Sequence, residues 1–276
     1  NIYCEIRGTI TINYNKLKDK KLVILAGGYG TRLSEETVNL PKPMVEIGGK
    51  PIIWHIIKYY SHFGVNDFII CCGYKGYMIK EYFVNYFNHN SDITIDLEKN
   101  NIEVHKKKSE SWRITLIDTG EGALTGTRLG KVKDYVLDEE FFFFTYGDGL
   151  SNVNLHEQVD FFTNKDFDAV VTGVTPPGRF GAIQSEGALV KNFVEKPQGD
   201  GGVINGGFFI LKPEIYKYIG DKDLSWEDQP LKHLAQNKKL GLFKHEGFWQ
   251  PMDTLRDKNY LDELWANDEA PWKIWE

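Results

Sequence analysis

The 276-residue sequence predicts an α/β fold in which a mainly parallel β-sheet is covered by helices. Three observations lead to this class. Apolar, β-rich runs alternate with helical patterns along the first two thirds of the chain, as in repeated βαβ units. The runs "KLVILA", "DFIICC" and "EFFFFTY" are almost continuously apolar, which is typical of strands buried on both faces of a sheet. The length and the 41% hydrophobic content suit a globular domain with a sizeable core.

The elements of the first part follow in order from residue 21. The predicted strands are "KLVILA", "DFIICCG", "WRITLIDTG", "EEFFFFTYGDG" and residues 168–175. The predicted helices are "KPIIWHIIKYYSHFG" and residues 77–87, 127–136 and 154–163. In the first of these helices, Pro51 lies near the first turn and Gly64 just past the end, as helix boundaries favour. Parallel strands joined by helices bring their carboxyl ends to one edge of the sheet, where such folds bind ligands.

After about residue 175 the predicted strands become shorter and richer in glycine. They are "RFGAIQ", "ALVKNFVEKP", "VINGGFFIL" and "LGLFKHEGFWQPMDT", with helices at 213–219, 226–236 and 255–265. No internal repeat is found. We therefore expect one domain over residues 21–276, in which an inserted mixed-sheet subregion caps the first half. Residues 1–20 show only a short alternating patch and are predicted to be an N-terminal extension outside the core fold.

Composition excludes several classes of protein. A net charge of −6 and a pI near 5.7 argue against a nucleic-acid binder, and the basic run 105–108 is predicted to be a solvated hairpin or loop face. No apolar run approaches the roughly 20 residues of a membrane span, and the N-terminus lacks the pattern of a signal peptide. Cys71 and Cys72 are predicted to pack inside a strand, which favours a reducing, cytoplasmic compartment.

The segment "LAGGYGTRLSEETVNLPKPM" raises the question of function. Glycines at the carboxyl end of the first strand let backbone N–H groups approach an anion closely. Arg32 and Lys42 add positive charge, and the prolines on both sides of Lys42 stiffen the loop that carries it. Such a loop suits a triphosphate whose α-phosphorus is attacked. The alternative is a glycine-rich turn with a surface lysine.

Two familiar phosphate-binding patterns are missing from this segment. The Walker pattern needs Gly-Lys-Ser/Thr, whereas Arg32 and Leu33 follow Thr31 here. The dinucleotide fingerprint needs a third glycine at the position of Leu33. A nicotinamide-dependent dehydrogenase is disfavoured for this reason, and also because "IICCGYKG" offers no acidic residue for a ribose.

Asp148 stands between two glycines at the end of the predicted strand "FFFFTY". A carboxylate there is placed to bind a metal or ligand at the edge of the sheet, although a lone aspartate is equally a helix cap or turn residue. His55 and His62 lie seven residues apart on one predicted helix, but without a partnering Glu or Cys motif they are not predicted to bind a metal.

Taken together, these segments resemble the sugar-1-phosphate nucleotidyltransferases. The resemblance runs through "LAGGYGTRLSEETVNLPKPMVEIGGKPIIWHI", "DFIICCGYKGYMIKEYF", "DTGEGALTGTRL", "FTYGDG", "PPGRFGAI", "EKPQGDGGVINGGFF" and "GFWQPMDTLRDK", in unbroken order over residues 21–276. Within the family, the blocks most resemble the branch that transfers a cytidylyl group from CTP to glucose 1-phosphate. The resemblance implies a Rossmann-like nucleotidyltransferase fold with a sugar-binding subregion, and Mg²⁺-assisted in-line attack on the α-phosphorus that yields CDP-glucose and pyrophosphate.

The resemblance also implies which residues act. Catalytic roles map onto Lys42, Arg32 and Asp148, and Mg²⁺ ligands onto Asp148 and Asp253. The nucleotide-binding positions are Leu25, Gly27, Gly28, Tyr29, Gly30, Thr31, Arg32, Lys42, Ala123, Thr125, Arg128 and Gly147. The sugar-phosphate positions are Gly181, Glu195, Lys196 and Asn205. Judged from the residues alone, Glu195 and Lys196 would be an exposed ion pair worth about 0 to 1 kcal/mol.

Further expectations come from the same resemblance. It implies a cytoplasmic homo-oligomer whose product enters the dideoxysugars of O-antigen lipopolysaccharide, with no nucleic-acid or membrane partner. Two alternatives stay open: an enzyme of this family that uses UTP or dTTP, and a catalytically inactive regulatory protein that binds nucleotide sugars. The regulatory protein would be expected to have lost charges that act only in the reaction, yet Arg32, Lys42, Asp148 and Asp253 are all present.

Overall fold

The structure, a computed structural model, describes residues 17–37, 39–107, 110–176, 182–186, 189–194 and 202–276. The first sixteen residues of the predicted N-terminal extension lie outside this set, and so do three predicted sugar-phosphate positions, Gly181, Glu195 and Lys196. The described chain begins at Leu17, whose side chain is fully buried in the main core. The domain boundary after residue 20 stays a prediction.

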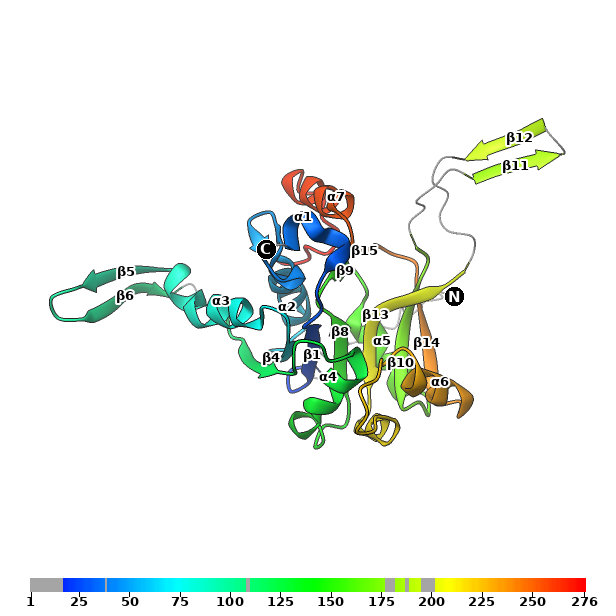
Figure 1. Cartoon of the computed structure of the whole chain (residues 1–276), viewed down its shortest axis with the longest axis horizontal. Coiled ribbons are helices and arrows are strands. Elements are labelled where there is room, and N and C mark those ends of the chain that lie inside the picture. Colours follow the sequence, from blue (N-terminus) through cyan, green and yellow to red (C-terminus); the bar gives the residue numbers. More distant parts are fainter. Residues whose placement is uncertain (1–16, 38, 108–109, 177–181, 187–188, 195–201) are drawn as a thin grey trace, which may run out of the picture.

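A seven-stranded sheet forms the centre of the molecule (Figure 1), in the order β14-β10-β13-β8-β1-β4-β7. The strands are β1 (Lys21–Ala26), β4 (Asp67–Cys72), β7 (Arg113–Asp118), β8 (Phe142–Tyr146), β10 (Ala169–Val174), β13 (Ile204–Leu211) and β14 (Leu240–His245). Only β13 among them runs antiparallel to its neighbours, β8 and β10. The prediction of a mainly parallel sheet is therefore confirmed.

Helices cover both faces of this sheet. They are α1 (Ser34–Thr37), α2 (Ile52–His62), α3 (Gly76–His89), α4 (Thr125–Lys131), α5 (Leu155–Thr163), α6 (Gln229–Gln236) and α7 (Leu255–Ala266). Successive strand residues point to opposite faces, so Phe143 packs in the core under α2, α5 and α7, and Phe142 and Phe144 pack in the core under α4 and α6. This alternation explains why four consecutive phenylalanines suit a central strand.

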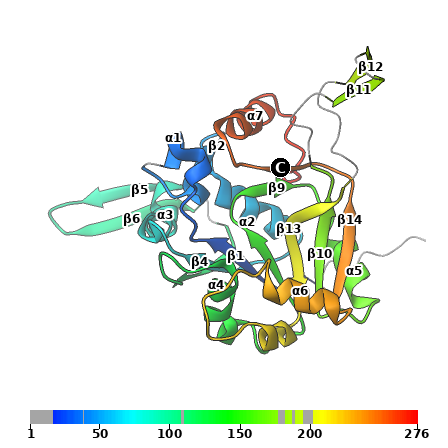
Figure 2. The same cartoon turned by 45° about the vertical axis from the view of Figure 1, so that its right-hand side comes forward.

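The second half of the chain completes the central sheet as well as adding a subregion. Strands β13 and β14 extend the main sheet, while β11 (Ala182–Glu186) and β12 (Leu189–Val194) form a separate antiparallel pair inserted between β10 and β13. Figure 2 shows this pair standing away from the sheet. The helix predicted at 226–236 begins only at Gln229, with Pro230 in its first turn, and residues 213–218 form a 3-10 helix.

Three further two-stranded sheets lie around the core. An arm made of β5 (Ser91–Asp96) and β6 (Asn101–Lys107) projects from the body in both views (Figures 1 and 2) and contains most of the predicted basic hairpin. The other two sheets are β2 (Glu46–Ile47) with β3 (Lys50–Pro51), and β9 (Gly149–Ser151) with β15 (Trp249–Pro251). In the described part of the chain, no helix is long and apolar enough to cross a membrane.

The two cysteines of β4 are buried free thiols, as the sequence predicted. Burial raises the pKa of Cys72 to about 11 and raises that of Cys71 further. Thiols with raised pKa values carry little thiolate at neutral pH, and the thiolate is the nucleophile. Cys71 and Cys72 are therefore core residues rather than candidate nucleophiles.

His55, in α2, hydrogen-bonds both to β2 and to the C-terminal segment of the chain. Its Nε2 lies 2.8 Å from the Ile47 carbonyl oxygen, and its Nδ1 accepts a hydrogen bond of 3.3 Å from the Trp272 indole N–H. These partners require a neutral ring with the proton on Nε2. Burial lowers the pKa of His55 to about 4, so the neutral form is the folded form at physiological pH.

This burial predicts a pH dependence of stability. The unfolded chain protonates His55 near its usual pKa of about 6.5, so stability is fully present above that pH and is lost as the pH falls toward 4. As the pH falls from about 7.5 to about 5, the contribution of His55 should lower the free energy of unfolding, measured in urea, by about 2 kcal/mol. His55→Gln keeps a donor and an acceptor but does not titrate, so an equally steep pH slope in that variant would contradict the assignment.

Candidate active site

A cavity of about 630 Å³ opens at the carboxyl ends of β1 and β8. Its volume is typical of sites for small molecules and cofactors. Every predicted site residue that the structure describes lines it: Leu25, Gly27, Gly28, Tyr29, Gly30, Thr31, Arg32, Lys42, Ala123, Thr125, Arg128, Gly147, Asp148, Asn205 and Asp253. The sequence prediction therefore selected residues that the fold brings to one cavity.

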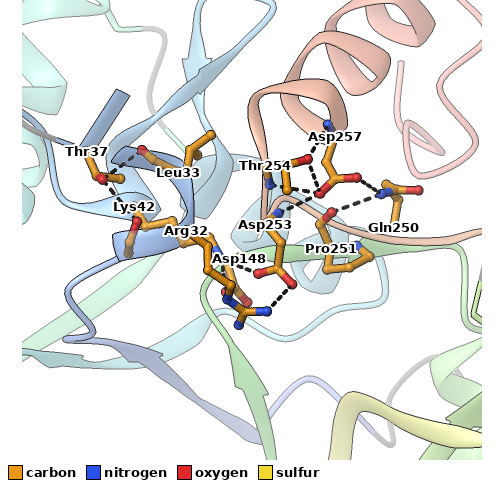
Figure 3. A network of polar contacts seen from close by, with 11 residues as sticks. Arg32, Leu33, Thr37, Lys42, Asp148, Gln250, Pro251, Asp253, Thr254 and Asp257 are labelled. Atoms are coloured by element: carbon orange, nitrogen blue, oxygen red, sulfur yellow. Dashed lines mark hydrogen bonds and ion pairs between the residues drawn. The ribbon is translucent and has the colours of Figure 1, made fainter. Parts of the chain in front are cut away.

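Four charged side chains meet at one end of this cavity (Figure 3). The Lys42 ammonium lies 2.6 Å from Asp148 Oδ2 and 2.8 Å from Asp253 Oδ1. Arg32 Nη1 lies 2.9 Å from the other oxygen of Asp253. Burial lowers the pKa of Lys42, but the two carboxylates outweigh it and hold the pKa above its usual value. Lys42 is therefore an ammonium at neutral pH.

The loop that carries Lys42 is held rigidly. Residues 41–44 are buried, with Pro41 at φ −68° and a short 3-10 helix over Lys42–Met44. The hydroxyl of Thr37, the last residue of α1, donates to the carbonyls of Gly30 at 3.0 Å and Leu33 at 2.8 Å, which ties the glycine loop to α1. Gly30 has φ +65°, and a Cβ there would lie 3.0 Å from Lys42 Cβ. The loop thus needs glycine both for its backbone angle and for the approach of Lys42.

The two aspartates are brought together by a short antiparallel ladder. Asp148 immediately precedes β9, and Asp253 follows β15 by two residues. These two strands pair, and the Met252 N–H continues the ladder by donating to the Asp148 carbonyl at 2.8 Å. The ladder explains how residues from distant parts of the chain reach one lysine.

Arg128 organises a second part of the cavity lining. Its side chain is buried, and burial lowers its pKa. It donates to the Gly27 carbonyl at 2.9 Å, the Gly120 carbonyl at 2.7 Å and the Glu121 carbonyl at 2.9 Å, besides Thr119 Oγ1 at 2.7 Å. Arg128 therefore lies behind the backbone of two loops and joins them.

These bonds fix the direction of the peptide groups. A trans peptide carries its N–H opposite to its C=O, so the N–H of Gly28 points away from Arg128. A Cβ added at Gly28 would meet nothing within 4 Å. Gly28 lines the cavity and its N–H points away from Arg128, and the binding of an anion by this donor stays a prediction.

Sequence reasoning missed two members of a polar chain beside the cavity, Tyr146 and Glu227, which join the predicted residues Thr125 and Asn205. The Tyr146 hydroxyl donates to the Glu227 carboxylate, which also accepts from the Thr125 hydroxyl at 2.6 Å. Asn205 Nδ2 donates to the same tyrosine oxygen at 3.2 Å. Tyr146 could have been found from its place at the carboxyl end of a central strand. Glu227 gave no signal, because its partners come from distant segments.

The carboxylates fit a divalent cation. Asp148 and Asp253 already reach one cation, the Lys42 ammonium, at hydrogen-bond distance. Among the described residues no group of three or more His, Cys, Asp or Glu side chains could hold a metal by itself. A pair of carboxylates completed by phosphate oxygens is a common site for Mg²⁺, whereas structural zinc sites use four protein ligands.

Comparison with known proteins agrees with this geometry. Residues 21–250 match the family model described as nucleotidyl transferase. A glucose-1-phosphate cytidylyltransferase of Salmonella typhi is 57% identical over 93% of this chain and 100% of its own length. A probable glucose-1-phosphate cytidylyltransferase of Bacillus subtilis is 44% identical over 92% and 100%. The crystal structure of HddC from Yersinia pseudotuberculosis matches with a TM-score of 0.64 and 25% identity, over 89% of this chain and 99% of that one. This chain is thus a member of the nucleotidyl transferase family.

Proposed function

We propose that this chain transfers a cytidylyl group from CTP to α-D-glucose 1-phosphate, giving CDP-glucose and pyrophosphate. The observation that carries the proposal is the 57% identity, over their whole length, to two Salmonella proteins named glucose-1-phosphate cytidylyltransferase. The cavity supports the same class of reaction, because a glycine loop, an arginine and a lysine face one another where a triphosphate would lie.

The residues suggest how the transfer proceeds. A phosphate oxygen of glucose 1-phosphate attacks the α-phosphorus of CTP in line, and pyrophosphate leaves on the opposite side. The Lys42 ammonium, held by two carboxylates, offsets the charge that gathers on the α-phosphate. Arg32, whose side chain is largely exposed, lines the cavity beside Asp253, where its charge would offset that of the departing phosphates. A phosphate nucleophile is already ionised near neutral pH, so no general base is needed.

Asp148 and Asp253 would hold Mg²⁺ in this proposal. Bound there, Mg²⁺ would neutralise phosphate charge and orient the phosphate oxygens. The sugar phosphate would be held by Asn205 together with Gly181, Glu195 and Lys196, which lie outside the described residues. Asn205 Oδ1 accepts from the Gly207 N–H at 2.8 Å, so its amide is held in a fixed orientation.

The backbone near Arg128 supports CTP as the nucleotide. Because the Gly120 and Glu121 carbonyls point to Arg128, the N–H groups of Glu121 and Gly122 point the other way, and Gly122 lines the cavity. Cytosine has an acceptor at N3, whereas uracil and thymine have an N–H there. A backbone donor at this edge would therefore favour cytosine.

We predict that CTP is the preferred nucleotide. Discrimination at one base edge is worth about 1 to 3 kcal/mol, so kcat/KM for CTP should exceed that for UTP or dTTP by about 5- to 150-fold. Purified protein is incubated with glucose 1-phosphate, Mg²⁺ and each of CTP, UTP, dTTP, ATP and GTP, and both pyrophosphate and nucleotide sugar are measured. Equal use of UTP or dTTP would favour the alternative of a family enzyme that uses those nucleotides. Absence of pyrophosphate with every nucleotide would favour a catalytically inactive regulatory protein.

We also propose that the protein acts as a cytoplasmic homo-oligomer. Support for the oligomer comes from the arm, which projects from the body of the molecule (Figure 1) and on which Ile95, Leu97 and Ile102 are exposed. An exposed apolar surface of this kind suits contact with another subunit. Sedimentation of the purified protein measures the oligomeric state directly.

A further inference from the structure

The segment that carries Asp253 is fastened by a residue that itself does not line the cavity. Asp257, in the first turn of α7, directs both carboxylate oxygens back toward the preceding chain (Figure 3). Its Oδ2 accepts from the Asp253 N–H at 3.1 Å, the Thr254 N–H at 2.9 Å and the Thr254 hydroxyl at 2.9 Å. Its Oδ1 accepts from Gln250 Nε2 at 3.0 Å.

These bonds do more than cap a helix. A capping box needs only the reciprocal bonds between Thr254 and Asp257, which are both present. The additional bonds reach the backbone of Asp253 and the buried side chain of Gln250 on β15. One carboxylate thus ties the helix, the strand and the intervening acidic residue together.

The position of Asp253 therefore has two supports. The β9–β15 ladder sets the distance between the backbones of Asp148 and Asp253. Asp257 holds the backbone of Asp253 independently of that ladder, by accepting from its N–H. Asp253 Cα then lies where its carboxylate reaches Lys42 and Arg32.

We propose that Asp257 is a positioning residue for the metal-binding carboxylate of Asp253. The proposal rests on the proposed function, in which Asp148 and Asp253 hold the divalent cation of the nucleotide complex. Partners that orient metal ligands commonly change metal affinity by about 10- to 100-fold when they are lost. Loss of the Asp257 charge should weaken the metal-dependent part of nucleotide binding, whereas metal-free binding should be unaffected.

The test compares CTP affinity in EDTA with CTP affinity in Mn²⁺, by calorimetric titration without glucose 1-phosphate. In the parent protein Mn²⁺ should tighten CTP binding. In Asp257→Asn that gain should shrink by at least about tenfold while affinity in EDTA stays within about twofold. Asp257→Glu keeps the carboxylate and should recover part of the gain.

Asp262→Asn is the matched control. Asp262 lies in the same helix and also accepts a backbone N–H, from Gly48 at 2.9 Å, and it pairs with Lys258 rather than with the segment that carries Asp253. In this variant Mn²⁺ should tighten CTP binding as much as in the parent protein. Its melting temperature reports how much stability is lost when a carboxylate of this helix is removed. Should Asp257→Asn fail to fold, Gln250→Met, which removes the donor to Asp257 Oδ1, takes its place and should reduce the gain in the same direction.

The outcomes separate the two proposals. A parental protein that gains nothing from Mn²⁺ overturns the metal site and the role of Asp257 with it. A parental gain that persists unchanged in Asp257→Asn, or that falls equally in Asp262→Asn, overturns the positioning role and leaves the metal site standing.

Discussion

Asp148→Asn is expected to lower turnover by at least about a hundredfold while the protein stays folded. The substitution keeps size and hydrogen bonding but removes one of the two carboxylates proposed to hold Mg²⁺. A metal ion at reacting phosphates supplies several kcal/mol of transition-state stabilisation, and about 1.4 kcal/mol corresponds to a factor of ten in rate. Pyrophosphate release at saturating CTP and glucose 1-phosphate measures the effect over a range of Mg²⁺ concentrations.

The fold should tolerate this change. Asp148 is partly exposed, its side chain retaining 33% of its accessible surface, and an asparagine oxygen can still accept from Lys42. Asp168→Asn is a suitable control, because Asp168 is a buried carboxylate paired with Lys217 at 3.0 Å and does not line the cavity. Asp168→Asn should lose stability but not turnover. Parental activity of Asp148→Asn at ordinary Mg²⁺ would show that the metal assignment is wrong.

The central sheet could be predicted from the sequence because its signals are local. The runs of β1, β4 and β8 are buried on both faces and therefore almost continuously apolar, so each can be recognised without its neighbours. The helix α5 also carries its own start signal, since Asn154 accepts from the N–H groups of His156 and Glu157. Local signals of this kind are visible in one sequence.

Pairing between distant segments could not be predicted in the same way. Strands β9 and β15 have three residues each and no distinctive pattern, yet their ladder brings Asp148 and Asp253 to one lysine. The sequence predicts an inserted mixed-sheet subregion in the second half but not which strands belong to it: β13 and β14 pair within the main sheet, and only β11 and β12 form the inserted pair. Such pairing depends on partners far along the chain, which the pattern of one strand does not specify.

Backbone direction was also beyond the sequence. The glycine loop predicted that N–H groups approach an anion, but which peptides turn outward depends on Arg128 holding the Gly27, Gly120 and Glu121 carbonyls inward. The sequence placed Arg128 in the nucleotide pocket only through the family resemblance. Its four bonds to these carbonyls and to Thr119 indicate that it shapes the pocket through the backbone.

Lys42→Met is the second substitution expected to have a large effect. The methionine can occupy the buried path of the lysine stem but brings no charge to the reacting phosphates. Loss of one preorganised donor to developing charge costs about 3 to 4 kcal/mol of transition-state stabilisation, which corresponds to a fall of about a hundred- to a thousandfold in kcat. Single-turnover measurement of pyrophosphate formation separates this loss from any change in substrate binding.

Lys42→Met should also lower the stability of the protein, because Lys42, unlike a surface lysine, is a buried partner of two carboxylates. In Lys42→Met the Asp148 carboxylate loses its ion-pair partner, while Asp253 keeps Arg32, so the melting temperature should fall in metal-free buffer. Mg²⁺ bound by the two aspartates would restore part of that stability without restoring the rate. Lys58→Met supplies the comparison, because Lys58 makes a similar half-buried pair with Glu110 at 2.7 Å outside the cavity and should lose stability without losing activity. A fully active Lys42→Met, or a loss of rate that Lys58→Met reproduces, would show that the Lys42 charge does not act on the reacting phosphates.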